Sequence, residues 1–173
     1  MHRIAVTGPE STGKSELTNA LAIHFGCPFV PEFARMYIEK LDRAYHRGDV
    51  EMIAIQQIEF EHYYKQHDHY PYVFFDTELI ITKVWFQYCF ADVPDFVQKQ
   101  LESGFFDLYL LCEPDIPWIP DPVREHGDDR EYFFELYRNE IVQLGKPYKV
   151  ISGIGKERTC KAIKAVEAFC NKQ

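Results

Sequence analysis

Two glycines, a lysine and a serine near the start of the chain have the spacing of a phosphate-binding site. Residues 8–15 read G-P-E-S-T-G-K-S and match the pattern G-x-x-x-x-G-K-[ST]. The motif directly follows an apolar run at residues 3–7 and opens a helical pattern at residues 14–25, which is the context that it requires. In such a loop, backbone N–H groups turn inward around an anion and the helix N-terminus adds partial positive charge.

We therefore expect this segment to bind nucleotide phosphates. Gly8 and Gly13 permit backbone conformations that a Cβ atom disfavours. Lys14 would reach the β- and γ-phosphates, and the Ser15 hydroxyl would coordinate Mg²⁺. The alternative is a glycine-rich turn without a ligand. The expected nucleotide-binding residues are Gly8, Pro9, Glu10, Ser11, Thr12, Gly13, Lys14 and Ser15.

Carboxylates follow two further predicted strands. Asp76 ends the apolar run at residues 72–75, so we expect it at the same sheet edge as the motif, where ligands bind in open α/β sheets. A carboxylate there can hold Mg²⁺ or accept a proton from an attacking hydroxyl, and Glu78 can support either role. The alternative is that Asp76 only caps the next helix.

Glu32 and Arg35 follow the second predicted strand. They are three residues apart at the start of a helical pattern, so both can face one side of that helix. We predict that the pair belongs to the acceptor-substrate pocket. The alternative, with equal weight on spacing alone, is a surface ion pair that contributes little stability.

A proline-rich segment at about residues 113–130, here called the lid segment, concentrates aromatic, acidic and basic groups. Arg124 and Arg130 would close over the phosphates and offset charge on the transferring phosphoryl group. Trp118 would stack on a flat ring, most favourably on a cationic one, and we assign Asp121 to the substrate side. The alternative is a proline-braced loop with Trp118 in the core.

Composition excludes several other classes of protein. The 173 residues carry 19 basic and 27 acidic side chains, a net charge of −8 that disfavours a nucleic-acid binder. The apolar runs are shorter than the roughly 20 residues that span a bilayer. Five cysteines without a regular spacing indicate reduced thiols, and the start of the chain lacks a signal-peptide pattern. We expect a soluble, cytoplasmic protein.

Short apolar runs alternate with helical patterns along the chain. Continuous β-rich runs separated by helices predict parallel strands covered on both faces, a three-layer α/β fold with right-handed crossovers. We expect one domain over residues 1–173 with a five-stranded parallel sheet. The predicted strands are residues 3–7, 28–30, 72–75, 108–112 and 148–151, and the predicted helices are about 14–25, 33–44, 52–67, 79–88, 95–102, 129–142 and 156–170.

With these residues in place, the chain resembles the ribosylnicotinamide kinase domain of the bacterial NadR type, within the AAA-labelled P-loop ATPase and kinase family. The shared segments are V-T-G-P-E-S-T-G-K-S, P-E-F-A-R at 31–35, the glutamines 56 and 57, F-F-D-T-E at 74–78, and L-Y-L-L-C-E-P-D-I-P-W-I-P-D-P-V-R at 108–124. The family often has D-T-D where this chain has D-T-E. Larger members carry further domains before the kinase, and we expect none here.

The resemblance implies ATP- and Mg²⁺-dependent phosphorylation of the 5′-hydroxyl of nicotinamide riboside, a step of NAD salvage. By this analogy Asp76 or Glu32 is the base that orients the acceptor hydroxyl, and Arg124 and Arg130 are lid arginines. Aromatic side chains hold the pyridinium ring in such kinases, which favours Trp118. The implied substrate-binding residues are Arg35, Glu78, Trp118 and Asp121, and the implied metal ligands are Ser15 and Asp76.

Other functions compatible with a phosphate loop are a regulatory ATPase, a nucleotide-binding module without turnover, and a kinase for another nucleoside. Carboxylates and arginines that lie in the same chain favour a kinase, because no partner has to supply an arginine. A lid that excludes water also suits phosphoryl transfer to an acceptor. The sequence leaves the choice between ATP and GTP and the oligomeric state open.

Overall fold

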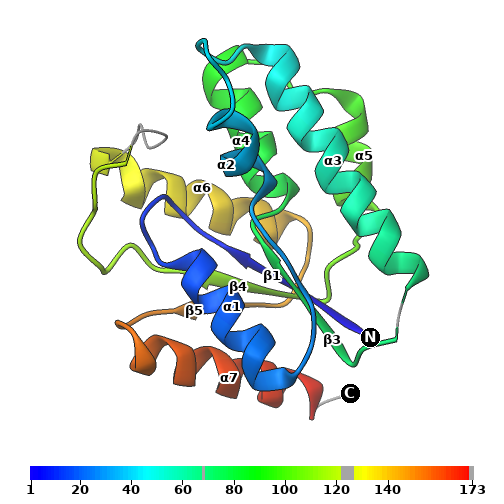
Figure 1. The fold of residues 1–173 in the computed structure, drawn as a ribbon, viewed down its shortest axis with the longest axis vertical. Coiled ribbons are helices and arrows are strands. Elements are labelled where there is room, and N and C mark those ends of the chain that lie inside the picture. The colour runs from blue at the N-terminus through cyan, green and yellow to red at the C-terminus, as the bar shows by residue number, and fades with distance from the viewer. Residues whose placement is uncertain (68, 122–126, 172–173) are drawn as a thin grey trace.

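The computed structural model describes residues 1–67, 69–121 and 127–171. Its centre is a five-stranded, all-parallel sheet with the strand order β2-β3-β1-β4-β5 (Figure 1). The predicted parallel sheet is confirmed, and the strand ends differ from prediction by one residue or none. The strands are β1 (His2–Thr7), β2 (Phe29–Val30), β3 (Tyr72–Asp76), β4 (Leu108–Cys112) and β5 (Tyr148–Ile151).

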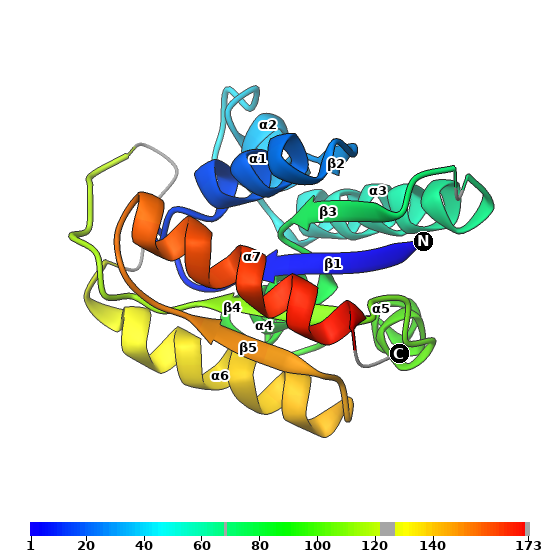
Figure 2. The same cartoon turned by 90° about the horizontal axis from the view of Figure 1, so that it is seen from below.

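Helices cover both faces of the sheet, as Figure 2 shows, so the predicted three layers are confirmed. One face carries α1 (Lys14–Phe25) and α7 (Lys156–Cys170). The other carries α3 (Arg47–Gln66), α4 (Leu79–Phe90), α5 (Asp95–Glu102) and α6 (Arg130–Gln143). The short helices are α2 (Phe33–Ile38), which packs on α3, and η1 (Gly127–Asp129), a 3₁₀ turn before α6.

Alternation along the strands divides the apolar residues between two cores. Phe74 packs toward α1 and α7, whereas its neighbours Val73 and Phe75 pack toward α3 to α6. In β1, Ala5 packs toward α3 to α6, whereas Ile4 and Val6 pack toward α1 and α7. Both faces of these strands are therefore buried, as expected for a parallel sheet. Within the described part of the chain, none of the helices has both the length and the apolar character needed to span a membrane.

Strand register brings the ends of three strands to one edge of the sheet. Val6 of β1 lies beside Asp76 of β3, and Thr7 lies beside Leu111 of β4. The loop after β1, the carboxylate that ends β3 and the start of the lid segment therefore emerge together. After β1 the chain crosses to β2 on one side of the sheet, whereas β4 lies next to β1 on the other side. Ligands of open α/β proteins bind in the crevice at such a reversal of strand order.

The predicted helix over residues 33–44 is wrong in its second half, because α2 ends at Ile38. Residues 39–46 fold back over the start of α3, where Asp49 is buried. Its carboxylate accepts hydrogen bonds from Arg43 at 2.7 and 2.8 Å, from Tyr37 at 3.1 Å and from the His46 backbone N–H at 2.8 Å. The guanidinium of Arg43 and the hydrogen bonds lower the pKa of this carboxyl. This network accounts for the departure of residues 39–46 from the predicted helix.

Gly8 is required by close contact between two backbones. Its φ is +139°, and a Cβ built on it would lie 2.7 Å from the Cys112 carbonyl oxygen. Gly145 also has a positive φ, +64°, but has open space around it.

We predict that Gly8→Ala lowers the free energy of unfolding more than Gly145→Ala does. The control substitution carries only the cost of a left-handed backbone, about 1–2 kcal/mol. Gly8→Ala adds a steric collision with β4. Urea denaturation of both variants measures how much stability this collision costs beyond the cost of the backbone conformation. Equal losses of stability would show that β4 can move away from the loop without cost.

Candidate active site

The loop between β1 and α1 has the backbone of a phosphate cradle. Positive φ values occur at Gly8, at Ser11 (+53°) and at Gly13 (+72°). Inside the loop, the Thr12 hydroxyl donates to the Pro9 carbonyl at 2.9 Å, and Lys14 Nζ donates to the same oxygen at 2.8 Å. Lys14 therefore already lies over the loop, from which it can turn to an anion.

This loop forms one wall of a cleft of about 430 Å³. Glu32 and Arg35 lie on the same cleft, so the structure brings these two predicted residues together with the loop. A second part of the lining, here called the aromatic wall, comes mainly from α4 and α6. The lining residues are 8–16, Glu32, Ala34, Arg35, Ile38, Tyr45, Gln57, Thr77, Ile81, Thr82, Trp85, Tyr88, Phe133 and Tyr137.

Asp76 lies buried at the end of β3, close to Ser15 and Lys14. Burial raises the pKa of its carboxyl, while the charge of Lys14 and hydrogen bonding to Ser15 oppose that rise. Its Oδ1 atom is buried and has no hydrogen-bond partner among the described residues. Asp76 is not among the residues that line the cleft, although the neighbouring Thr77 is. A buried carboxylate oxygen close to a hydroxyl suits a hard cation such as Mg²⁺.

Glu78, and not Asp76, caps the following helix. Oε2 of Glu78 accepts from the Ile80 backbone N–H at 2.6 Å and Oε1 accepts from the Thr7 hydroxyl at 3.0 Å. Burial raises the pKa of Glu78 to about 7. The structure thus places Glu78 behind the cleft with both oxygens occupied, apart from the other residues predicted to bind substrate. Because Glu78 supplies the cap, Asp76 can face the loop.

Arg35 lines the cleft and links α2 to the lid segment. Its Nη2 pairs with Asp121 of the lid segment at 2.7 Å, and its Nε pairs with Glu39 at 2.9 Å. The pKa of Arg35 is raised, first by the hydrogen bond to Asp121. The charge of Glu32, which spacing predicted as a neighbour of Arg35, also contributes to this rise. Asp121, 86 residues away in the sequence, was not predicted as a partner of Arg35.

The lid segment contacts the phosphate loop through Ser11 and Arg130. Ser11 Oγ accepts from the Ile119 backbone N–H at 3.0 Å, and Arg130 Nη1 donates to the carbonyls of Ile116 at 2.8 Å and Ser11 at 3.4 Å. Arg130 therefore lies against the loop, in contact with backbone carbonyls, and its action on phosphates stays a prediction. The other predicted lid arginine, Arg124, lies outside the described residues.

Trp118 is half-buried, and its ring lies against Gly127 at the start of η1. It is not among the residues that line the cleft. Its indole Nε1 is buried without a hydrogen-bond partner in the described part of the chain. The aromatic residues that do face the cleft include Trp85 and Tyr88 of α4, which helical periodicity alone assigns to a core.

Sequence reasoning also missed Arg158, which lies in the first turn of α7 and contacts the loop at Thr12. Gln57 belongs to a segment shared with the resembling family, to which sequence reasoning assigned no role. Its side chain lies in the cleft and accepts a hydrogen bond from the Thr82 hydroxyl at 2.6 Å. Neither residue stands in a local pattern that would mark it, because the partners come from distant segments.

The parallel sheet, the phosphate loop and the cleft beside it define a P-loop nucleotide-binding fold of the nucleoside-kinase type. Among solved structures, deoxyadenosine kinase from M. mycoides superposes with a TM-score of 0.60 at 14% identity, covering 96% of this chain and 99% of that one. A family model described as "AAA domain" matches residues 3–158. The chain therefore belongs to this AAA domain family.

The chain is also similar to the trifunctional NAD biosynthesis/regulator protein NadR of Salmonella typhimurium and of Escherichia coli. Identity to each is 31% over 144 residues, which is 77% of this chain and 34% of the relative. A crystal structure of NadR in complex with NR superposes with a TM-score of 0.70 at 25% identity over 97% of this chain. The chain spans about a third of the length of these curated relatives and 49% of that solved chain.

Behind the cleft, α3 contributes a second buried acid, Glu61, which is 3% exposed. Its Oε2 accepts from the Gln100 side chain at 2.6 Å. Burial raises the pKa of Glu61 to about 8, and the neighbouring Glu78 adds to the rise. The folded protein therefore holds a proton that the unfolded chain releases at lower pH.

This acid predicts how stability changes with pH. The free energy of unfolding should fall as the pH rises from the unfolded pKa of about 4.5 through the folded pKa of about 8. Glu61→Gln keeps an acceptor for Gln100 and should make this decline shallower, whereas Glu59→Gln on the exposed side of α3 should not. Urea denaturation at pH 5 and pH 8 measures the decline in the free energy of unfolding for each variant. If Glu61→Gln showed the same decline as the wild type, Glu61 would not be the group that causes it.

Proposed function

We propose that this chain is an ATP-dependent kinase that phosphorylates the 5′-hydroxyl of nicotinamide riboside, yielding the mononucleotide in NAD salvage. The observation that carries the proposal is a phosphate loop that opens onto a cleft with an aromatic wall and with Glu32 among its lining residues. The loop suits the donor phosphates, and the cleft is large enough for a nucleoside. The similarity to NadR, and to its complexes with NR and with NAD and AMP-PNP, supports this acceptor and donor.

The aromatic wall suits a flat cationic ring. Trp85 and Tyr45 meet edge to face with ring centroids 5.0 Å apart, and Tyr88 meets Phe133 at 5.2 Å. A pyridinium ring gains from the negative faces of aromatic side chains. Glu32 adds negative charge on the same cleft, which a neutral purine would not use.

We assign the chemistry to groups at the sheet edge. Backbone N–H groups of residues 8–15 and Lys14 would bind the donor phosphates, and Ser15 and Asp76 would hold Mg²⁺, which neutralises phosphate charge when bound. Asp76 or Glu32 would accept the proton of the acceptor hydroxyl. Arg35 would bind substrate from the cleft entrance, and Arg130 would offset charge near the loop.

We further propose that residues 1–173 form one kinase domain with the lid segment as its cover. The contacts of Ile119 and Arg130 with Ser11 and the Arg35–Asp121 pair support a closed position of the described part of this segment. Five free cysteines support a reducing, cytoplasmic location.

A nucleoside panel tests the reaction. With Mg·ATP, we expect nicotinamide riboside to give a product heavier by one phosphoryl group in mass spectrometry, and its uncharged dihydro form to react more slowly. Lys14→Ala should reduce transfer at least a hundredfold, since it removes the charge nearest the phosphates, whereas Lys164→Ala on exposed α7 should not. ADP formation at one rate with and without every nucleoside would instead identify an ATPase.

The aromatic wall has its own test. Trp85→Ala should raise the KM for nicotinamide riboside about tenfold with little change in the KM for ATP, since stacking on a cation is lost. Trp118→Ala serves as the comparison, because both variants remove an indole but only Trp85 lines the cleft. If only Trp118→Ala raised the KM for nicotinamide riboside, the pyridinium ring would bind at the lid segment instead. If Trp85→Ala raised the KM for nicotinamide riboside and for ATP equally, Trp85 would be a core residue.

A further inference from the structure

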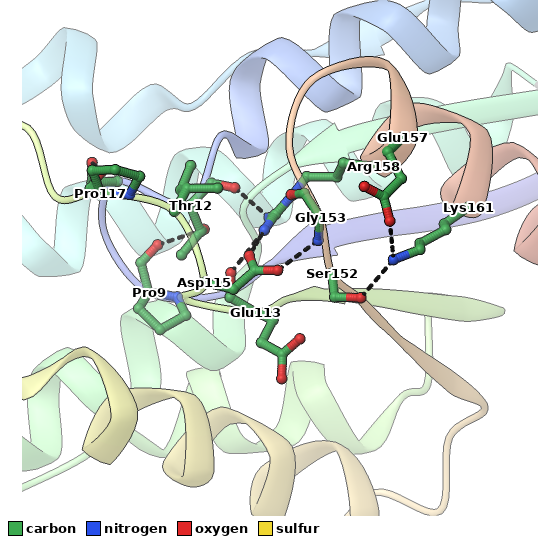
Figure 3. Close-up of polar contacts among 12 residues, drawn as sticks. Pro9, Thr12, Glu113, Asp115, Pro117, Ser152, Gly153, Glu157, Arg158 and Lys161 are labelled. Carbon is green, nitrogen blue, oxygen red and sulfur yellow. Dashed lines mark hydrogen bonds and ion pairs between the residues drawn. The ribbon is translucent and has the colours of Figure 1, made fainter.

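Arg158 occupies an unusual position for a cation, because its side chain is buried next to the phosphate loop. It is 4% exposed and projects from the start of α7 toward the sheet edge (Figure 3). Nε donates to the Gly153 carbonyl at 2.6 Å, Nη1 to the Thr12 carbonyl at 2.6 Å, and Nη2 to the Glu113 carbonyl at 3.0 Å. Nη2 also pairs with the carboxylate of Asp115.

These acceptors come from three segments that are far apart in sequence. Thr12 belongs to the phosphate loop, Glu113 and Asp115 begin the lid segment after β4, and Gly153 lies between β5 and α7. Asp115 reinforces the link, since its Oδ2 accepts from the Gly153 backbone N–H at 2.5 Å. One planar guanidinium with five N–H donors can serve all of these acceptors at once, which a lysine cannot do.

The contact at Thr12 fixes the direction of one N–H group of the loop, that of Gly13. The Thr12 carbonyl and the Gly13 N–H belong to one planar peptide unit and point in opposite directions. When Arg158 holds the carbonyl outward, the Gly13 N–H is held toward the inside of the loop. A hydrogen bond that involves a charged donor is among the stronger ones in proteins, and burial keeps water from competing for it.

We propose that Arg158 is a positioning residue for nucleotide binding. It orients the Thr12–Gly13 peptide toward the donor phosphates and ties the phosphate loop to residues 152–155 and to the start of the lid segment. The inference rests on the nucleotide-binding part of the proposed function and is independent of which acceptor is used.

The test measures the affinity for Mg·ATP without any acceptor, by titration calorimetry on the full chain. We expect Arg158→Lys and Arg158→Ala to weaken binding about tenfold or more, the loss that one charged hydrogen bond implies. In the kinase assay the KM for ATP should rise while the KM for the acceptor stays near the wild-type value. Arg158→Lys retains the positive charge, so weaker Mg·ATP binding in that variant shows that the planar guanidinium geometry is needed.

Arg3 provides a matched control at the opposite edge of the sheet. Its guanidinium also bridges two segments, through hydrogen bonds to Asp107 at 2.9 and 3.2 Å. Arg3→Lys should lower the melting temperature and leave the affinity for Mg·ATP unchanged. A purely structural role for Arg158 predicts the same pattern in Arg158→Lys, which would overturn the proposal.

Asp115→Asn decides the question if the Arg158 variants do not fold. Asp115 is more exposed than Arg158, and asparagine keeps one acceptor oxygen for Gly153 or Arg158. We expect this variant to fold and to bind Mg·ATP more weakly, whereas wild-type affinity would contradict the proposal. A wrong acceptor assignment leaves this test intact, but wild-type protein without affinity for ATP would overturn both proposals.

Discussion

A loop that binds anions through its backbone N–H groups needs other partners for its carbonyls. In this protein the partners are a hydroxyl and a lysine of the loop itself and two arginines from α6 and α7. The Pro9 carbonyl accepts from Thr12 and Lys14, the Ser11 carbonyl from Arg130, and the Thr12 carbonyl from Arg158. The loop's shape therefore depends on α6 and α7, which lie at the other end of the sequence, and the nucleotide site forms only when the fold is complete.

The parallel sheet makes this convergence possible because it brings strand ends to one edge. The register of β1 between β3 and β4 sets Asp76 beside the loop and presses Cys112 against Gly8. The buried Glu78 caps α4, so Asp76 does not need to serve as the cap. The cost of burying such carboxyls is reduced by keeping a proton on them, which appears as raised pKa values at Glu78 and Glu61.

The lid segment contacts three separate parts of the site. Its first residues contact Arg158, its middle contacts Ser11, and Asp121 pairs with Arg35 of α2. The acidic exterior that follows from a net charge of −8 offers ATP no long-range attraction, so capture of the nucleotide depends on these local groups. For the proposed reaction, the same negative field would mildly favour a cationic acceptor over a neutral one.

The amino-acid sequence by itself determined the five strands, their parallel arrangement and the loop at residues 8–15. These features follow from continuous apolar runs and a contiguous motif, both of which are local. Only the tertiary structure decided that Glu78 and not Asp76 caps α4, that residues 39–46 leave the helix to cover Asp49, and that Trp85 lines the cleft. It also brought Arg158 to Thr12 across 146 positions. Backbone carbonyls are the same in every residue, so a sequence carries no mark of which one a distant arginine will hold.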